Sequence, residues 1–294
     1  MGIFGIKKVS SKKGSFFEQD FVASPTKSLA TARGERATKG TVISMTVQKL
    51  IQYLGERIPS SLSEPWDNDG DMVVPCRNAE VTGVLCALDC TSGAIARAKE
   101  LGCNVILTHH PLIFKPLSRL TDTDSVGKRV LECVANGIAV LSYHTRLDCL
   151  EGGVNDCLAS ALGLTNVTAF LPYGRLGEVE PQPFETFAEY VGKALETEEL
   201  SCVKACPTAN KVALVSGSGK DEIVHALRAG ADTFVTGEAS HSAMLDCKEL
   251  GLNLICATHY ATERVVLPFL QSMVQEAGLR GELYPFRREE EYGV

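Results

Sequence analysis

The chain has 294 residues, of which 45% are hydrophobic and 22% are charged, as in a soluble globular protein of one large or two ordinary domains. This composition excludes a disordered chain, a collagen-like fibre and a small disulfide scaffold. The formal net charge of −7 is uneven, because residues 1–44 hold eight Lys or Arg against three acids (+5), which leaves −12 for the remainder. Such an acidic body lacks the clustered Lys and Arg that neutralise phosphates, so there is no strong nucleic-acid signal.

The N-terminal region and the lack of long apolar runs indicate the cellular compartment of the protein. No stretch approaches the ~20 consecutive apolar residues of a membrane helix, and the N-terminus lacks the apolar core of a signal peptide. We therefore expect a cytoplasmic protein with no membrane association. Residues 1–44, rich in Lys, Ser, Gly and Thr, are expected to form a disordered basic extension. Mitochondrial import is the alternative, although transit peptides favour Arg and Lys dominates here.

The first predicted helix follows Thr46, because apolar residues at 47, 50, 51 and 54 share one helical face. Strands and helices then alternate, as strands at 81–88, 104–107 and 138–142, a helix that Thr91 or Ser92 begins and Gly102 ends, a helix at 125–135, and a helix after Gly153. Strand, helix and strand with such short connections indicate parallel βαβ units with right-handed crossovers.

A Pro-rich segment with Pro172, Pro181 and Pro183 interrupts this alternation, which then resumes. The second series has helices at 185–195, 221–229, 240–250 and 261–276 and strands at 212–215, 233–236 and 252–257. We therefore predict an α/β fold of two lobes with mixed, largely parallel sheets. The N-terminal α/β lobe would span 45–170, a linker 171–185 and the C-terminal α/β lobe 186–294.

Three of the predicted strands end in side chains that can bind metals. The segments are Thr108-His109-His110, Tyr143-His144 with Asp148 soon after, and Thr258-His259. Ligands of open α/β sheets collect at the carboxyl ends of the strands. Four of the six histidines of the chain lie at these ends, which chance placement would not produce.

The spacing of these residues predicts a dinuclear metal site at the strand ends between the two lobes. Glu263 follows His259 by four residues, so the two side chains share a helical face. His109 and His110 are adjacent in an extended segment, where successive side chains diverge, and therefore address two ions more readily than one. With Asp148 as a second carboxylate, the mixed nitrogen and oxygen ligands suit two divalent ions among Zn, Fe, Mn, Co and Ni. Such a pair activates a shared water.

Two further residues are candidates for accessory catalytic roles. His144 is the weakest of the candidate ligands, because it could instead orient Asp148 or contact the substrate. Glu238 lies in another strand-end segment, and either residue could carry a proton during catalysis. The loop Gly217 to Lys220 lacks the Walker pattern, yet its amides could still bind an anion.

Several of these segments also resemble a known family. The stretches THHPLIF, YHTRLD followed by GGVND, TGEASHSAMLD and THYATE are similar to the metal-binding signature of the NGG-one-interacting factor three family, whose members are also described as GTP cyclohydrolase I type 2-like. WDNDG at 66–70 resembles the WDN segment of that family, although Asp71 and Met72 follow where an apolar pair is usual. The SHSAMLD stretch looks more like eukaryotic members, and the resemblance covers about 45–294.

This resemblance implies a ligand set, an assembly and an activity. In it, His109 and His110 would each bind one ion, Asp148 would complete one site, His259 the other, and Glu263 would bridge. Members of the family resemble toroidal homohexamers with the metals facing an internal cavity. The expected function is a metal-dependent hydrolase of a small-molecule substrate such as a nucleotide or phosphoester. The alternative is a metal-stabilised oligomeric module that binds protein partners without turnover.

Overall fold

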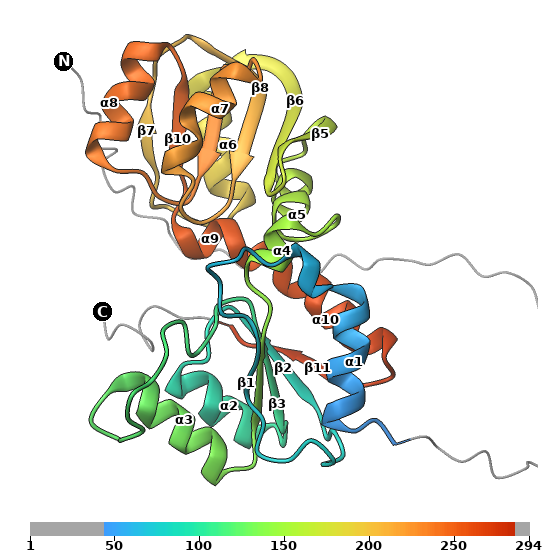
Figure 1. The fold of residues 1–294 in the computed structure, drawn as a ribbon. Helices are drawn as coiled ribbons and strands as arrows, with labels where there is room; N and C mark the ends of the chain where they lie inside the picture. Colours follow the sequence, from blue (N-terminus) through green and yellow to red (C-terminus); the bar gives the residue numbers. More distant parts are fainter. Residues whose placement is uncertain (1–43, 286–294) are drawn as a thin grey trace, which may run out of the picture. The chain divides into compact units, whose positions relative to one another are not determined.

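The computed structural model describes residues 44–285 (Figure 1). The basic extension predicted at 1–44 therefore lies, except for Ser44, outside the described residues, as does the C-terminal end from residue 286. Within the described part, no helix is both long and apolar enough to cross a membrane. The strands form two mixed sheets interleaved with helices, which confirms the predicted α/β class.

The first sheet has the strand order β1-β4-β3-β2-β11. Its strands are β1 (Gly70–Val73), β2 (Val84–Ala87), β3 (Val105–Thr108), β4 (Ala139–Ser142) and β11 (Gly281–Leu283). Strands β2, β3 and β4 are parallel to one another, β11 is parallel to β2, and β1 is antiparallel to β4. The carboxyl ends of β2, β3 and β4 therefore meet at one edge of the sheet.

Helices cover both faces of this sheet (Figure 1). They are α1 (Val47–Arg57) and α10 (Leu267–Glu276) on one face and α2 (Ser92–Glu100) and α3 (Ser125–Ala135) on the other. Successive strand residues alternate between the two cores: Leu85 and Ile106 pack with α2 and α3, whereas Cys86 and Leu107 pack with α1 and α10. Burial on both faces explains why these strands read as continuous apolar runs.

The second sheet has the strand order β5-β6-β8-β9-β10-β7. Its strands are β5 (Thr165–Leu171), β6 (Gly174–Pro183), β7 (Ser201–Val203), β8 (Thr208–Val215), β9 (Thr233–Thr236) and β10 (Asn253–Cys256). Only β8, β9 and β10 are parallel, and the pairs β5 with β6, β6 with β8 and β7 with β10 are antiparallel. Its helices are α5 (Val154–Ala161) and α6 (Phe184–Ala194), which share a core, and α7 (Ile223–Arg228) and α8 (His241–Leu250), which share another.

Two short helices connect strand ends to longer helices. Helix α4 (Thr145–Cys149) follows β4, and α9 (His259–Glu263) follows β10. The predicted helix at 261–276 is therefore divided into α9, a 3-10 turn η3 (Arg264–Val266) and α10. A hydroxyl begins α9, because the side chain of Thr258 accepts a hydrogen bond from the amide of Ala261 at 3.2 Å.

The predicted linker at 171–185 is corrected by the structure, because it contains β6, which pairs with both β5 and β8. The prolines suggested a break in regular structure. Pro181, which has no N–H to donate, lies where the register of β6 on β8 shifts between Glu178 and Gln182, so the strand tolerates it.

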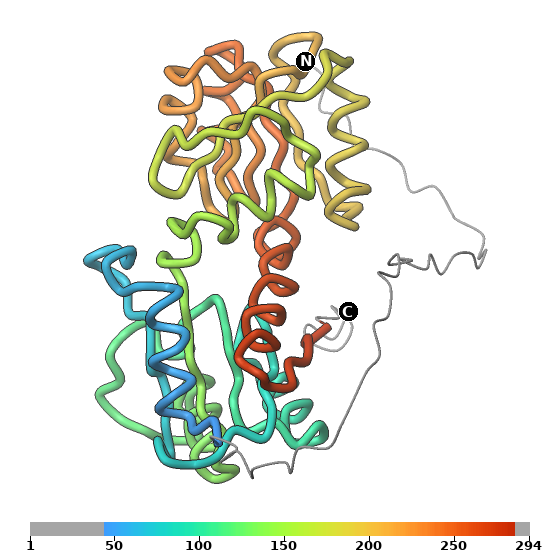
Figure 2. Tube along the Cα trace, turned by 90° about the vertical axis from the view of Figure 1, so that its right-hand side faces the viewer, coloured from blue at the N-terminus to red at the C-terminus, as the bar shows by residue number. Residues whose placement is uncertain are grey.

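The end of the described chain departs from the predicted C-terminal lobe at 186–294. Helix α10 and strand β11 belong to the first sheet, where Leu270 and Val274 complete the core under α1. The hydroxyl of Tyr53 on α1 donates to the carbonyl oxygen of Met273 on α10 at 3.1 Å, across 220 residues of sequence. Figure 2 shows this C-terminal helix, in red, running alongside elements coloured blue to green. Apolar burial, and not sequence order, decides to which sheet the segment belongs.

Candidate metal site at the strand ends

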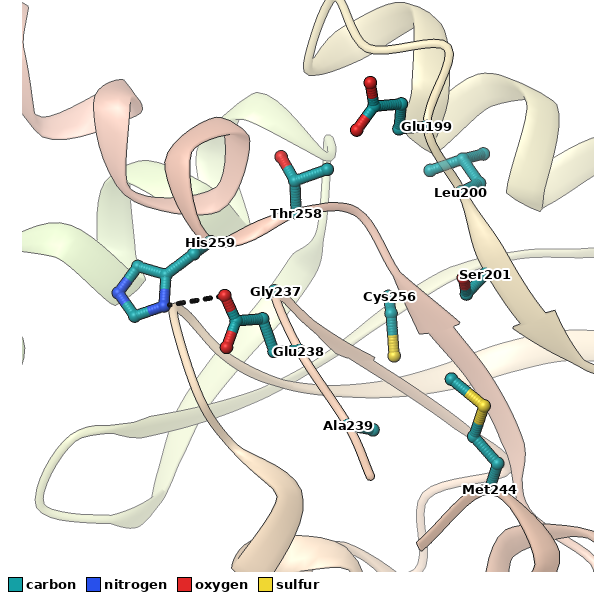
Figure 3. Close-up of a pocket in the computed structure, with 10 residues that line it drawn as sticks. All are labelled: Glu199, Leu200, Ser201, Gly237, Glu238, Ala239, Met244, Cys256, Thr258 and His259. Atoms are coloured by element: carbon teal, nitrogen blue, oxygen red, sulfur yellow. Dashed lines mark ion pairs between the residues drawn. The ribbon is translucent and has the colours of Figure 1, made fainter. Parts of the chain in front are cut away.

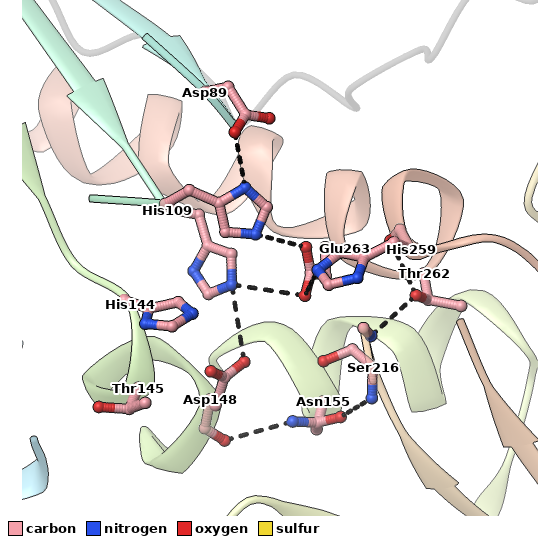
Figure 4. Close-up of polar contacts among 12 residues, drawn as sticks. Asp89, His109, His144, Thr145, Asp148, Asn155, Ser216, His259, Thr262 and Glu263 are labelled. Carbon is pink, nitrogen blue, oxygen red and sulfur yellow. Dashed lines mark hydrogen bonds and ion pairs between the residues drawn. The ribbon is translucent and has the colours of Figure 1, made fainter. Parts of the chain in front are cut away.

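The histidines singled out in the sequence lie together at the carboxyl ends of parallel strands (Figure 4). His109 and His110 directly follow β3, His144 lies between β4 and α4, and His259 is the first residue of α9 after β10. The ring centroids of His109 and His110 are 4.9 Å apart, and those of His110 and His259 are 5.4 Å apart. The topology rule for α/β sheets therefore located the cluster correctly.

His109 is fully buried and has one ring nitrogen without a hydrogen-bond partner. Its Nδ1 lies 3.1 Å from the carbonyl oxygen of Tyr143, which can only accept, so Nδ1 carries the proton. The unpaired Nε2 is 3.8 Å from Asp148 Oδ1 and 3.8 Å from Glu263 Oε1. A lone pair buried among carboxylates without a donor fits a cation better than it fits the protein alone.

His110 is held on both sides by carboxylates. Its Nδ1 is 2.9 Å from Asp89 Oδ1, and its Nε2 is 2.9 Å from Glu263 Oε2. Burial disfavours the charged ring, but the hydrogen bonds with Asp89 and Glu263 outweigh burial and raise the pKa of His110 to about 10. A carboxylate on the far nitrogen is the arrangement that orients metal-binding histidines.

Glu263 contacts three histidines from one carboxylate. Oε1 is 3.0 Å from His259 Nε2 and 3.8 Å from His109 Nε2, while Oε2 lies against His110. Burial alone would raise its pKa, but these histidines hold the pKa of Glu263 well below its usual range. A carboxylate shared in this way has the geometry to contact more than one ion.

Asp148 and His144 complete the side of the site that follows β4. Burial raises the pKa of Asp148 from its usual value, an effect that nearby His109 only partly offsets. His144 Nδ1 lies 2.9 Å from Asp67 Oδ1, and Asp67 Oδ2 accepts from the amide and the hydroxyl of Thr145 at 3.1 and 2.7 Å. Burial opposes ionisation of Asp67, but the contacts with Thr145 and His144 lower its pKa, so the carboxylate accepts and His144 Nδ1 donates.

Ligand atoms gather into two groups within the described residues. His109, His110 and His144 form one, and His110, His259 and Glu263 form the other, with ligand atoms within 4.8 Å of one another in each. His110 belongs to both groups, which therefore adjoin. Asp148 stands slightly apart from them, at its 3.8 Å contact with His109.

Glu238 lies behind His259, at the edge of a separate cavity of about 450 Å³ (Figure 3). Its Oε1 is 3.4 Å from His259 Nδ1, and the side chain is 61% exposed. The carboxylate of Glu238 thus contacts the ring nitrogen opposite to the one that meets Glu263. This placement suits orienting the ring of His259.

Two glycines bring the backbone close to α9. A Cβ at Gly217, whose φ is +61°, would lie 2.3 Å from Glu263 Oε1 and 3.2 Å from His259 Nε2. A Cβ at Gly237 would lie 2.8 Å from His259 Cα. Any side chain at these positions would displace the two candidate ligands, so glycine is needed here for the backbone to approach α9 closely.

The loop that contains Gly217 already uses some of its amides in hydrogen bonds within the protein. Three of them donate to side chains: Ser216 to Asn155 at 2.8 Å, Gly217 to Thr262 at 3.0 Å and Gly219 to Thr236 at 2.9 Å. The amides of Gly217 and Gly219 are therefore engaged, and anion binding by the glycine-rich turn stays a prediction. The loop also fixes the wall against which Glu263 packs.

Thr258, directly before His259, has a strained backbone. Its φ of 67° and ψ of 148° are in a region that residues with a Cβ rarely adopt. Its side chain begins α9 and its carbonyl oxygen accepts from the hydroxyl of Thr262 at 3.0 Å. These contacts hold an unfavourable conformation at the point where His259 enters the site.

Sequence reasoning missed Asp67 and Asp89, the partners of His144 and His110. Asp89 comes just after β2, so applying the strand-end rule to this strand as well would have found it. Asp67 lies in the WDNDG segment, 77 residues before His144, and no spacing rule connects them. In the same segment, Asp69 pairs with Arg146 of α4 at 2.6 Å. The segment therefore secures the start of α4.

Fold and site together define a class of protein: a mixed α/β chain whose strand ends gather a buried cluster of histidines and a glutamate that could hold a metal ion. Residues 45–285 match the model of the family described as Duf34/NIF3 (NGG1p interacting factor 3). The chain belongs to this family, which confirms the resemblance seen in its motifs.

Individual relatives cover most of the chain. A protein named GTP cyclohydrolase 1 type 2 homolog from Clostridium acetobutylicum is 32% identical over 75% of this chain and 86% of its own length. NGG1-interacting factor 3 from Saccharomyces cerevisiae is 29% identical over 79% of this chain and 91% of its own. The crystal structure of a Staphylococcus aureus protein matches with a TM-score of 0.76 and 27% identity, over 83% of this chain and 97% of that chain.

Proposed function

We propose that the protein is a dinuclear metal-dependent hydrolase that acts on a small molecule such as a nucleotide or a phosphoester. The observation that carries this proposal is the buried Nε2 of His109, which has no hydrogen-bond partner and faces Asp148 and Glu263 at 3.8 Å. The names of relatives such as the Clostridium acetobutylicum GTP cyclohydrolase 1 type 2 homolog support the same direction.

Five residues would hold the ions, namely His109, His110, Asp148, His259 and Glu263. Glu263 would contact both, because its two oxygens face different histidines. A pair of divalent cations would supply an activated water and would stabilise negative charge that develops on a substrate oxygen. Zn, Fe, Mn, Co and Ni all suit these nitrogen and oxygen donors.

The chain itself provides an oriented proton acceptor. Because His144 Nδ1 donates a hydrogen bond to Asp67 Oδ1, the other ring nitrogen, Nε2, is left to accept a proton. His144 lines a cavity together with Asp148, His259 and Glu263. His144 is thus placed to move a proton at the substrate, with Asp67 as the residue that positions it. Glu238, which contacts His259 from behind, is the weaker candidate for proton transfer.

Substitution of Glu263 tests the proposal. We expect Glu263→Ala to lose at least one of two bound ions and to lose hydrolysis, because the affected contacts reach all three neighbouring histidines. Elemental analysis gives the metal content, and a panel of nucleotides and phosphoesters gives the activity. Glu249→Ala, an exposed change on α8, is the matched control for loss of a carboxylate. Full metal content in Glu263→Ala with its fold intact would contradict the ligand assignment.

A second candidate function is a metal-stabilised module that binds protein partners without turnover. The printed name of the Saccharomyces cerevisiae relative, NGG1-interacting factor 3, favours it. This function predicts a loaded metal site with no hydrolysis of any compound in the panel. The same two measurements therefore separate the candidates.

We further propose that the protein assembles as a homohexamer in the cytoplasm. The resemblance to toroidal homohexamers noted from the motifs is the ground for this assembly, and light scattering of the purified full chain measures it. A mass of one 31.6 kDa chain in solution would contradict the hexamer. Recovery of the chain from mitochondria without residues 1–44 would contradict the location.

A further inference from the structure

A cavity of about 410 Å³ opens onto the candidate metal site and has exposed aromatic rings in its lining. Trp66 is 63% exposed and Phe114 is 46% exposed. The two rings meet edge to face at 6.3 Å, and each lies about as close to the ring of His144, at 6.2 and 6.1 Å. The volume is that of a small-molecule site, and exposed aromatic faces next to reactive groups are suited to stacking with a flat ring.

Another part of the lining presents a carboxylate with spare accepting capacity. Glu222, in the 3-10 turn η2 (Lys220–Glu222), accepts from the hydroxyl of Tyr173 at 2.8 Å through Oε1. Its buried Oε2 forms an ion-pair contact of 2.9 Å with His225 Nδ1 but no hydrogen bond among the described residues, so both oxygens keep lone pairs for a further donor. A ligand with adjacent N–H groups would satisfy this carboxylate, because a carboxylate pairs well with two parallel donors.

The charge of the lining disfavours a strongly anionic ligand. Among the described residues, the cavity is lined by four carboxylates and by no Lys or Arg: Glu64, Asp148, Glu222 and Glu263. Two divalent cations would neutralise four carboxylates and leave no excess positive charge. A polyphosphate would therefore find no protein cation beside it, whereas a neutral or positively charged ring would meet aromatic faces and an acceptor.

We infer that the substrate is an uncharged or positively charged planar nitrogen heterocycle whose N–H edge is read by Glu222 and whose face stacks on one of the two rings, Trp66 or Phe114, which lie at 72° to each other. A nucleoside or a free base with an amidine-type edge belongs to this class, and a nucleoside polyphosphate does not. The inference rests on the proposed function, because a metal-activated water would act on the bound ring, but it replaces the nucleotide or phosphoester given there as examples by an uncharged or positively charged ring. Glu222 is the specificity-determining residue.

The chain offers a built-in reporter for this site. Trp66 is its only tryptophan, so fluorescence excited selectively at tryptophan reports on the cavity. The metal-loaded protein is titrated with guanosine, which is uncharged and presents adjacent N–H donors, with adenosine, which lacks that pair of donors, and with GTP. We expect saturable quenching by guanosine, with adenosine and GTP each binding at least about 10-fold more weakly.

Glu222→Gln tests the proposed reader directly. The amide keeps the size of the side chain but replaces one acceptor with a donor, so guanosine affinity should fall roughly 10- to 100-fold while adenosine affinity changes little. Glu249→Gln removes the same charge from the exposed face of α8 and is the matched control. Tyr173→Phe removes only the hydrogen bond at Oε1 and should lower guanosine affinity by less.

Metal analysis of the same samples separates this inference from the proposed function. GTP binding at least as tightly as guanosine, or unchanged guanosine affinity in Glu222→Gln, overturns the inference even if the metals and hydrolysis are present. Guanosine binding that depends on Glu222 in a chain that holds no metal supports the ring-reading site and overturns the hydrolase proposal instead.

Discussion

The two halves of the candidate metal site are held in place by different physical means. On the first sheet, His109 and His110 leave β3 directly, and hydrogen bonds with the carbonyl oxygen of Tyr143 and with Asp89 fix their rings. On the second sheet, His259 and Glu263 lie on a short helix. That helix begins at a strained residue and packs against glycine backbone.

This difference indicates that the two halves fail in different ways. Hydrogen-bonded rings lose orientation when a partner is replaced, but the backbone that carries them is a central strand. Ligands positioned by close packing move when volume is added nearby, because packed interiors have no space to absorb it. Volume changes should therefore damage the α9 half most, and polar substitutions should damage the β3 half most.

The largest expected effect comes from Gly217→Ala. The new Cβ would lie 2.3 Å from Glu263 Oε1, so the carboxylate has to move, and metal affinity should fall more than about 100-fold with a loss of stability of roughly 2 to 4 kcal/mol. Isothermal titration with Zn²⁺ and denaturant unfolding of the metal-free protein measure the two effects.

Gly251→Ala is the matched control, because Gly251 also has a positive φ, +79°, but nothing lies within 4 Å of an added Cβ. It should lose only the ~1 to 2 kcal/mol of a left-handed alanine and should keep its metal affinity. Equal metal affinities in the two variants would show that the packing of Gly217 on Glu263 does not position the ligand.

The next prediction compares Asp89, which contacts His110, with Glu238, which contacts His259. Asp89→Asn weakens the contact at 2.9 Å with His110 Nδ1, so we expect a roughly 10- to 100-fold loss of metal affinity. Glu238→Gln alters a contact of 3.4 Å from a side chain that is 61% exposed, and should cost less than about threefold. Zn²⁺ titration of both variants in the same buffer measures the ratio. If Glu238→Gln loses more Zn²⁺ affinity than Asp89→Asn, then polar substitutions damage the α9 half most, contrary to the expectation.

The halves also differ in how far the sequence predicts them. The buried parallel strands and the helices between them follow from apolar runs and hydroxyl or carboxylate caps, and the prediction placed them within a few residues. The predicted site residues lie where the strand-end rule puts them, and their role as ligands stays a prediction. Asp67 could not be predicted, because its contact with His144 joins segments 77 residues apart.

The remaining differences have a tertiary origin. Strand β5 is mostly exposed along its length and therefore lacks the apolar pattern of a buried strand. Strands β7 and β11 have three residues each, too few for a periodic signal, and exist because a longer neighbour offers an edge. The return of α10 to the first sheet depends on which core its apolar face completes, and local sequence does not encode that choice.

The smallest expected effect concerns the strain at Thr258 and is best measured in the metal-free protein. In Thr258→Gly the backbone keeps its conformation, but the cost of about 1 to 3 kcal/mol that a residue with a Cβ incurs there disappears. Loss of the capping side chain, when glycine replaces it, destabilises the helix by only a few tenths of a kcal/mol. We therefore expect a gain of stability on the order of 1 kcal/mol. Thr258→Ala keeps the strain and loses the cap, so it should be destabilised by about 1 kcal/mol. Thr258→Ser keeps both and should change stability little.

In Thr258→Gly, metal affinity should fall although stability rises. A glycine at 258 widens the range of directions in which His259 can enter the site, so Thr258→Gly should bind Zn²⁺ several-fold more weakly, by roughly the 0.5 to 1 kcal/mol of added backbone freedom. If Thr258→Gly is more stable than the unchanged protein and binds Zn²⁺ with the same affinity, then the hydrogen bonds of Thr262 and the close packing against Gly217 already fix α9. The strain at Thr258 would then be incidental to the site, and close packing alone would position the second half.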